Sequence, residues 1–285
     1  MSDAAEREVA AEELSGEPGG QPRAAAFFDL DRTLISGASA FAFGMAAWRH
    51  DMVTARELVN DAANALVFRL TGGSDERTER TRDRILGAVE GTAVEDLAEI
   101  GEEVVPELLA KVRPESQSLL EMHAEARRDR YIVSASPQEL TDALAQALGL
   151  EGSVGTRSEI VGGRYTGRLD GPFVYGAGKA EAIAKLAAEK GYDLRLSYAY
   201  SDSASDLPML ELVGHPVAVN PDRNLEQVAH QRGWPIVVFS RKAKRVVKTT
   251  TASAGAAGIA LATYFFGRRH GRISAEAARG RRFGR

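Results

Sequence analysis

Four polar segments of the chain carry residue types that suit phosphoryl transfer. They are 29–33 (Asp-Leu-Asp-Arg-Thr), Ser134, Lys179 and 202–206 (Asp-Ser-Ala-Ser-Asp). Carboxylates that gather at one place repel each other unless a cation holds them, and a set of oxygen ligands without Cys or His favours Mg2+. A hydroxyl and an amine beside such a cation could hold phosphoryl oxygens, because phosphoryl transfer depends on positioning and charge neutralisation. A carboxylate can also be the nucleophile.

The elements around these segments are expected to bring them together. Asp29 ends an apolar run, Ser134 lies at the end of a second run, and Asp202 follows a third. Side chains two apart on a strand, such as those of Asp29 and Asp31, point to the same side. In open parallel sheets, ligands bind beyond the carboxyl ends of the strands, so these groups should share one rim.

The whole pattern predicts an α/β fold with a Rossmann-like parallel sheet, because apolar runs alternate with helical patterns. Buried strands are expected at 24–30, 130–136, 196–203, 216–220 and 235–240, and helices at 115–128, 137–148 and 178–191. The Gly-rich segment 154–171 alternates in the manner of a hairpin. Lys179 falls in the first turn of its helix, where the macrodipole disfavours a cation, so a negative partner is expected beside it.

The segment that follows the first strand has a different character. Apolar residues recur there at helical spacing, at 58–70 and again at 94–108, with no pattern typical of a strand. This predicts an inserted all-helical domain over 38–113. Residues 1–23 are acidic and rich in Ala, Gly and Glu, which predicts disorder. They contain no pattern of a secretory signal peptide, so we expect a cytoplasmic body.

The four segments, in this order, resemble the motifs of the haloacid dehalogenase superfamily. The resemblance is to the phosphoserine-phosphatase-like subfamily IB, in which a helical C1 cap is inserted after the first strand. The motifs are DLDRT, the strand-end Ser134, Lys179 and DSASD, and the resemblance covers about 24–240. It implies a Rossmann-like core formed by 24–37 and 114–240, with 38–113 as the cap that closes over the site.

The resemblance implies a role for each matching residue. Asp29 would attack phosphorus and become phosphorylated, and Asp31 would protonate the leaving oxygen and then activate water. Thr33 would orient the region of Asp31. Ser134 and Lys179 would bind the phosphoryl oxygens of the substrate.

The same resemblance implies Mg2+ as the cofactor. The ion would lie between Asp29, the backbone carbonyl of Asp31, and Asp202. Asp206 would either support the shell of the metal or pair with Lys179. The expected activity is therefore that of a Mg2+-dependent phosphomonoesterase.

Two positions depart from the phosphoserine phosphatase pattern. Ala38 stands where those enzymes usually carry a Glu for the substrate's amino group, and Ser205 stands where they usually carry Asn. Arg32 replaces a Gly that is common between the second Asp and Thr of the first motif. The first two departures weaken the assignment to phosphoserine but not the assignment to phosphatases.

The C-terminal 45 residues differ in charge from the rest of the chain. Residues 241–285 hold 12 Lys and Arg and one acid, for a net charge of +11, whereas residues 1–240 have a net charge of -15. Within this basic tail, 249–267 is an uncharged segment of 19 residues, close to the roughly 20 that cross a bilayer. Association with an anionic membrane is the favoured interpretation. A soluble appendage is the alternative, and contact with nucleic acid is the least favoured.

These observations leave the substrate open. A lipid-derived phosphate fits a membrane-facing tail, soluble phosphoserine is the alternative, and a non-catalytic, membrane-tethered regulatory module on the same fold is a third interpretation. The absence of Cys excludes disulfides, thiolate zinc sites and Cys nucleophiles. The five histidines show no metal-binding spacing, and Lys179 is not part of a P-loop, because Ala180 follows it where a P-loop has Ser or Thr.

Overall fold

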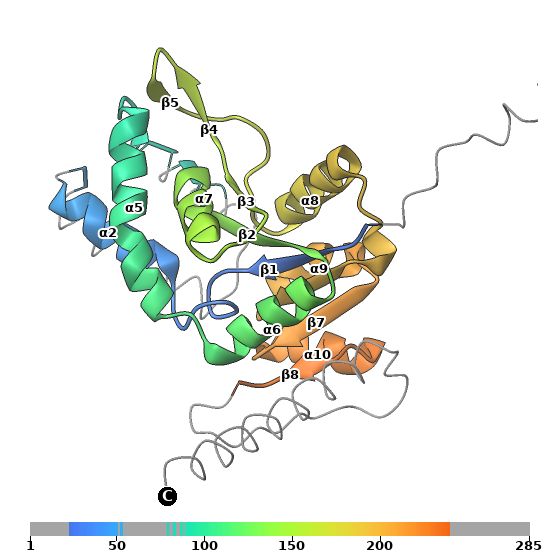
Figure 1. Ribbon diagram of the computed structural model, residues 1–285. Helices are drawn as coiled ribbons and strands as arrows, with labels where there is room; N and C mark the ends of the chain where they lie inside the picture. The colour runs from blue at the N-terminus through green and yellow to red at the C-terminus, as the bar shows by residue number, and fades with distance from the viewer. Residues whose placement is uncertain are drawn as a thin grey trace, which may run out of the picture.

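The computed structural model describes residues 23–50, 52–53, 79, 82–83, 86–87 and 89–239. Its centre is a six-stranded parallel sheet in the order β3-β2-β1-β6-β7-β8 (Figure 1). The strands are β1 (Ala25–Asp29), β2 (Asp129–Pro137), β3 (Gly152–Thr156), β6 (Tyr198–Ser201), β7 (His215–Val219) and β8 (Ile236–Val237). The predicted α/β class with a parallel sheet is confirmed.

Helices cover both faces of this sheet, so the central strands β1 and β6 are apolar up to the polar residue that ends each of them. Every residue of β1 is buried, and its side chains alternate between two apolar clusters. Phe28 faces the cluster formed with α5 (Val94–Ala110), α6 (Pro114–Glu125) and α7 (Gln138–Ala147). Phe27 faces the cluster formed with α8 (Ala177–Lys190), α9 (Leu207–Leu212) and α10 (Arg223–Arg232).

Helices follow the first strand, as predicted. α2 (Ser39–Arg49) lies beside α5, and α5 packs against α7 (Figure 1). Gly101 of α5 lies at this last contact, where a Cβ would be 3.5 Å from the Cα of Leu140, an ordinary van der Waals distance. The helix predicted around 94–108 is confirmed, whereas that around 58–70 lies outside the described residues. The boundaries 24–37, 38–113 and 114–240 stay predictions.

The hairpin predicted over 154–171 is confirmed, but it occupies only residues 158–169 of that range. The first residues of the range form β3, which pairs with β2, and the antiparallel hairpin consists of β4 (Ser158–Val161) and β5 (Arg164–Leu169). Gly155 explains the difference, because a Cβ there would lie 2.7 Å from the Cα of Gln138 at the start of α7. Its lack of a side chain fits a strand under a helix, not a hairpin turn. The turn instead uses Gly162 and Gly163, both with positive φ.

Both ends of the chain extend beyond what the structure describes. Residues 1–22 of the predicted N-terminal segment, the basic tail 241–285 and its apolar segment 249–267 lie outside the described residues. Arg23 is described, and it pairs with Asp129. None of the helices within the described ranges has the length and apolar character that a bilayer crossing requires.

Candidate active site

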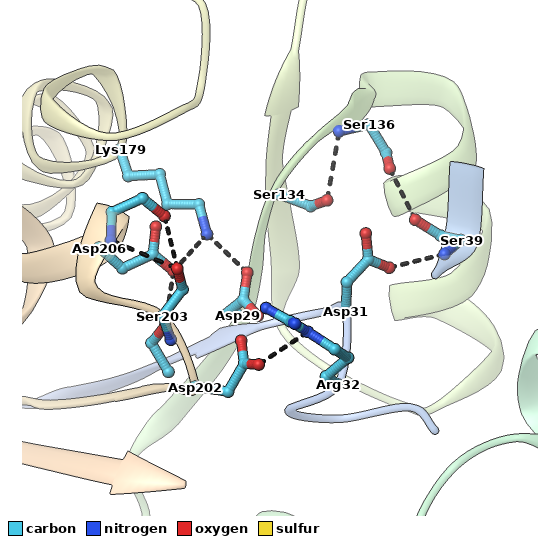
Figure 2. A network of polar contacts seen from close by, with 12 residues as sticks. Asp29, Asp31, Arg32, Ser39, Ser134, Ser136, Lys179, Asp202, Ser203 and Asp206 are labelled. Carbon is cyan, nitrogen blue, oxygen red and sulfur yellow. Dashed lines mark hydrogen bonds and ion pairs between the residues drawn. The ribbon is translucent and has the colours of Figure 1, made fainter. Parts of the chain in front are cut away.

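The four polar segments meet at the carboxyl ends of the central strands. Asp29 ends β1, Ser134 lies in the second half of β2, and Asp202 directly follows β6. Since β1 lies between β2 and β6, the chain leaves β1 at the point where the strand order changes direction, which is where open sheets bind ligands. Figure 2 shows these side chains around one region, with Lys179 reaching in from α8.

Lys179 lies between two carboxylates. Its Nζ donates to Oδ1 of Asp29 at 2.6 Å and to Oδ2 of Asp206 at 2.8 Å, and all three side chains are buried. Gly178 allows the turn before the lysine, because a Cβ there would lie 1.9 Å from the carbonyl oxygen of Phe173. The expected negative partner of Lys179 is therefore present twice, which offsets the unfavourable first-turn position of the cation.

Asp206 has a second hydrogen bond, which the sequence did not indicate. The hydroxyl of Ser201 at the end of β6 donates to Oδ2 of Asp206 at 2.7 Å. Asp206 lies in the short 3-10 helix η2 (Ala204–Asp206), and the backbone N–H of Ala204 donates to Oδ2 of Asp222 at 2.9 Å. Of the two roles considered for Asp206, the structure shows the ion pair with Lys179.

Asp202 forms an ion pair with Arg32. The guanidinium Nε of Arg32 lies 2.8 Å from Oδ2 of the buried Asp202. Arg32 has φ +63°, a left-handed conformation that costs a non-glycine residue about 1 kcal/mol. Sequence reasoning noted Arg32 only as a replacement for Gly and missed this contact.

A different group of contacts surrounds Asp31. The backbone N–H of Ser39, the first residue of α2, donates to Oδ1 of Asp31 at 2.7 Å. The hydroxyls of Ser39 and Ser136 share a hydrogen bond of 3.0 Å, and the N–H of Ser136 donates to Oγ of Ser134 at 3.2 Å (Figure 2). Ser39 and Ser136 were not predicted as site residues, and a Ser at the start of a helix is too common to reveal them.

Thr33 is buried in the turn after β1. Its carbonyl oxygen accepts a hydrogen bond of 2.8 Å from the hydroxyl of Ser116, whereas its own Oγ1 is buried and has no hydrogen-bond partner. An unsatisfied buried hydroxyl costs about 1 to 3 kcal/mol, so the position of Thr33 is not explained by protein contacts alone.

Burial dominates the electrostatics of the site. It raises the pKa of Asp29 to about 8, against the opposing effect of Lys179, with Asp206 and Asp202 raising it further. Burial also raises the pKa of Asp202 to about 7 and raises that of Asp31. Burial alone would lower the pKa of Lys179, but Asp206 and Asp29 raise it on balance. The lysine is therefore charged, and the carboxylates need more positive charge than they have.

A hard divalent cation fits this donor set. Asp29 and Asp202 are buried carboxylates with raised pKa values, and the backbone carbonyl of Asp31 is the third oxygen that the sequence predicts. No three acidic or histidine side chains form a ready metal site within the described part of the chain. Two carboxylates and one backbone carbonyl supply only two side chains of this kind. So few protein ligands suit an ion that keeps several of its water molecules.

Comparison with known proteins assigns the family. A family model for haloacid dehalogenase-like hydrolases matches residues 26–211. The chain is 40% identical over 243 residues to phosphoserine phosphatase SerB1 of Mycobacterium tuberculosis, covering 84% of this chain and 79% of that protein. It is 32% identical over 219 residues to a histidinol-phosphatase of Neisseria meningitidis, covering 75% of this chain and 98% of that protein.

A solved structure shows the same fold. A Bordetella pertussis protein of unknown function matches with a TM-score of 0.67 and 27% identity, covering 76% of this chain and 98% of that one. The fold, the matched residues and the named relatives agree with one another. The chain therefore belongs to the haloacid dehalogenase-like hydrolases. It is a phosphatase, and its relatives are phosphoserine-phosphatase-like.

Proposed function

We propose that the protein is a Mg2+-dependent phosphomonoesterase that forms an aspartyl-phosphate on Asp29. The observation that supports this most directly is the buried cluster at the end of β1, where Lys179 lies 2.6 Å from Asp29 and Asp202 comes from the neighbouring strand end. Such an arrangement binds and neutralises a doubly charged phosphate, which is the main requirement of phosphoryl transfer.

In the first step, Asp29 attacks the phosphorus atom. Lys179 holds Oδ1 of Asp29, so Oδ2 is the attacking oxygen. A bond forms between Oδ2 and phosphorus while the bond between phosphorus and the alcohol oxygen breaks. Asp31 gives its proton to that oxygen, and the alcohol leaves neutral. Burial raises the pKa of Asp31, which helps this residue to carry a proton at neutral pH.

In the second step, water releases the phosphate. Asp31, now a carboxylate, takes a proton from a water molecule, and the water oxygen bonds to phosphorus. The bond between phosphorus and Oδ2 of Asp29 breaks, so free phosphate leaves and both carboxyl groups return to their starting state. The two steps use one residue as acid and then as base.

The remaining residues bind the phosphoryl oxygens and the cation. Ser134 and Lys179 hold phosphoryl oxygens, and Thr33 orients the region of Asp31 through its backbone carbonyl, which accepts from the hydroxyl of Ser116. Asp29, Asp202 and the carbonyl of Asp31 would hold Mg2+. When bound, this ion would neutralise charge on the phosphoryl group and on the surrounding carboxylates.

For the substrate, we propose the phosphate monoester of a primary alcohol. Two relatives are named for phosphoserine and for histidinol phosphate, and both compounds carry the phosphate on a primary carbon next to an amino group. Phosphoserine itself is the alternative substrate, supported by the similarity to SerB1. Ala38 speaks against it, because it offers no carboxylate for an amino group. The hypothesis of a lipid-derived phosphate as substrate depends on membrane association of the tail 241–285.

A substrate panel tests the proposal. Purified full-length protein is incubated with p-nitrophenyl phosphate, phosphoserine, histidinol phosphate and phosphatidic acid, with Mg2+ or with EDTA, and released phosphate is measured. We expect Mg2+-dependent release, with the two amino alcohol phosphates ahead of phosphatidic acid. If phosphate is released from none of the four, the protein is a non-catalytic module instead.

We further propose that the basic tail binds anionic membrane surfaces. Its 12 basic residues would each contribute about 1 kcal/mol near such a surface. Co-sedimentation of the full-length protein with vesicles tests this. Binding to phosphatidylglycerol vesicles that is lost in high salt is expected, and equal binding to neutral phosphatidylcholine vesicles would contradict the electrostatic mechanism.

A further inference from the structure

Three hydrogen bonds, two from backbone N–H groups and one between hydroxyls, form a path from Asp31 through Ser39 and Ser136 across the site. Asp31 accepts from the N–H of Ser39, the Ser39 hydroxyl bonds that of Ser136, and the N–H of Ser136 donates to Ser134 (Figure 2). The path therefore joins the proposed proton donor, Asp31, to the proposed phosphate-binding hydroxyl, Ser134. It crosses from the start of α2 to the end of β2.

The start of α2 depends on this path. The N-cap residue Ala38 has no side chain that could satisfy the first N–H groups of the helix, and the carboxylate of Asp31 takes one of them instead. The Ser39 side chain is completely buried, so its hydroxyl needs a partner, and Ser136 provides it. The helix thus begins at a point that is attached both to Asp31 and to β2.

The same contacts determine which atoms face the substrate. Because Oγ of Ser134 accepts from the N–H of Ser136, the hydrogen of the Ser134 hydroxyl is left to donate to a phosphoryl oxygen. Because Oδ1 of Asp31 is held by Ser39, Oδ2 is left to carry the proton for the leaving oxygen. Ser39 and Ser136 therefore link the position of the acid, Asp31, to that of the phosphate-binding Ser134.

We propose that Ser39 and Ser136 are positioning residues, whose shared hydrogen bond aligns the proton of Asp31 with the phosphoryl group held by Ser134. This inference rests on the proposed function. It predicts that losing either hydroxyl misplaces the acid while the nucleophile Asp29, held separately by Lys179, stays in place.

The acidity of the leaving group makes this role measurable. p-Nitrophenolate is a stable anion and leaves without a proton, whereas the more basic phenolate of phenyl phosphate needs the proton of Asp31. The two substrates have nearly the same shape. A misplaced acid therefore slows the first step with phenyl phosphate and largely spares the first step with p-nitrophenyl phosphate, whereas the second step is the same for both substrates. The ratio kcat/KM reports on the steps up to release of the alcohol, so it isolates the first step.

The test uses the full-length variants Ser39→Ala and Ser136→Ala with both substrates. A misplacement of about 1 Å can cost up to about 100-fold, so we expect kcat/KM for phenyl phosphate to fall about 10-fold or more. We expect kcat/KM for p-nitrophenyl phosphate to fall less than about 3-fold. Ser136→Thr keeps a hydroxyl and should restore most of the lost rate.

Three further measurements keep the interpretation sharp. Ser118→Ala deletes a hydroxyl that bonds the carbonyl of Pro114 on α6, and it should leave both rates unchanged. The double variant should lose no more rate than one single variant, because both hydroxyls belong to one path. Melting curves identify a variant that loses rate by unfolding, and such a variant is then measured below its melting range.

The outcomes separate this inference from the proposed function. If the wild-type protein releases phosphate from neither substrate, the proposed function fails and this inference fails with it. If the wild type is active and the variants lower kcat/KM equally for both substrates, or for neither, the proposed function stands and the positioning role is wrong.

Discussion

The two halves of the site hold their carboxylates in place by different interactions. In the charged half, formed by Asp29, Lys179, Asp202 and Asp206, opposite charges are buried at 2.6 to 2.8 Å. In the hydroxyl half, formed by Asp31, Ser39, Ser134 and Ser136, the carboxylate accepts from a backbone N–H, and the hydroxyls of Ser39 and Ser136 share a hydrogen bond.

The difference indicates a division of labour. Buried charge pairs are rigid and costly to disrupt, which suits the nucleophile and the cation. Hydrogen bonds of neutral groups contribute only about 1 kcal/mol each and can rearrange, which suits an acid that must act twice and a helix at the edge of the site. The charged half should therefore govern stability and binding, and the hydroxyl half should govern proton transfer.

The largest effect is expected for the nucleophile of the charged half. Asp29→Asn keeps the shape of the side chain and an oxygen for Lys179, but removes the attacking carboxylate. We expect phosphate release to fall by roughly a thousandfold or more, with an unchanged circular dichroism spectrum. The exposed Asp96→Asn on α5 is the matched control. An active Asp29→Asn protein would show that the nucleophile lies elsewhere.

The next largest effect is expected for Lys179→Met. It leaves two buried carboxylates, Asp29 and Asp206, without their cation, and breaking a buried pair costs about 3 to 4 kcal/mol. Urea unfolding followed by circular dichroism measures this loss. Lys185→Met changes an exposed lysine of the same helix and should have little effect. Equal losses in the two variants would mean that the Lys179 pairs add no stability.

Cation binding tests the charged half directly. Mg2+ at about 100 times its dissociation constant should raise the free energy of unfolding by about 2.7 kcal/mol. Asp202→Asn should abolish this increase, since the buried Asp202 is a proposed ligand, and Asp96→Asn should keep it. Thermal unfolding with Mg2+ and with EDTA provides the comparison. An Asp202→Asn protein that gains as much as the wild type would exclude Asp202 as a ligand.

The charged half could be predicted from the sequence because its chemistry is unusual. Asp29, Asp202 and Lys179 follow apolar runs or open a helix, and carboxylates in such places require a cation. Packing was also predictable where it depends on patterns of several residues, as in the strands and in α5. The order of the strands around β1 then explains why the groups meet.

The hydroxyl half and the edge of the sheet could not be predicted, because they depend on single contacts. Ser39 looks like any Ser at a helix start, and only the burial of α2 against Ser136 gives it a partner. Gly155 reads as a hairpin glycine until α7 is seen above it. Arg32 pairs with Asp202 from a left-handed backbone conformation, which the sequence around it does not reveal.

Stability in acid also depends on a neutral buried pair, His123 and Tyr200, which can be compared with the charged half of the site. His123 is fully buried and bonds the hydroxyl of Tyr200 at 2.8 Å. Burial lowers its pKa from 6.5 to about 3, so the unfolded chain takes up a proton below pH 6.5 while the folded chain does not. Its contribution to stability is complete above pH 6.5 and falls by about 2 kcal/mol by about pH 5.

The charged half should respond to acid with the opposite sign. Raised pKa values at Asp29 and Asp202 mean that their protonation favours the folded state as the pH falls. Urea unfolding at several pH values separates the effect of His123 from that of the charged half. The proteins compared are the wild type, His123→Gln and the exposed-site control His230→Gln. His123→Gln should remove the loss between about pH 6.5 and 5. A curve parallel to that of wild type would refute a neutral His123.

The smallest effect concerns the backbone that carries Arg32 into the charged half. Arg32→Ala and Arg32→Gly both remove the ion pair with Asp202, so the difference between them reports only on the residue's φ of +63°. Glycine adopts this conformation freely and alanine does not, so Arg32→Gly should be about 1 kcal/mol more stable in urea. Equal stabilities would mean that the turn relaxes when the guanidinium is removed. In that case the ion pair with Asp202, and not the turn, holds the left-handed backbone in place.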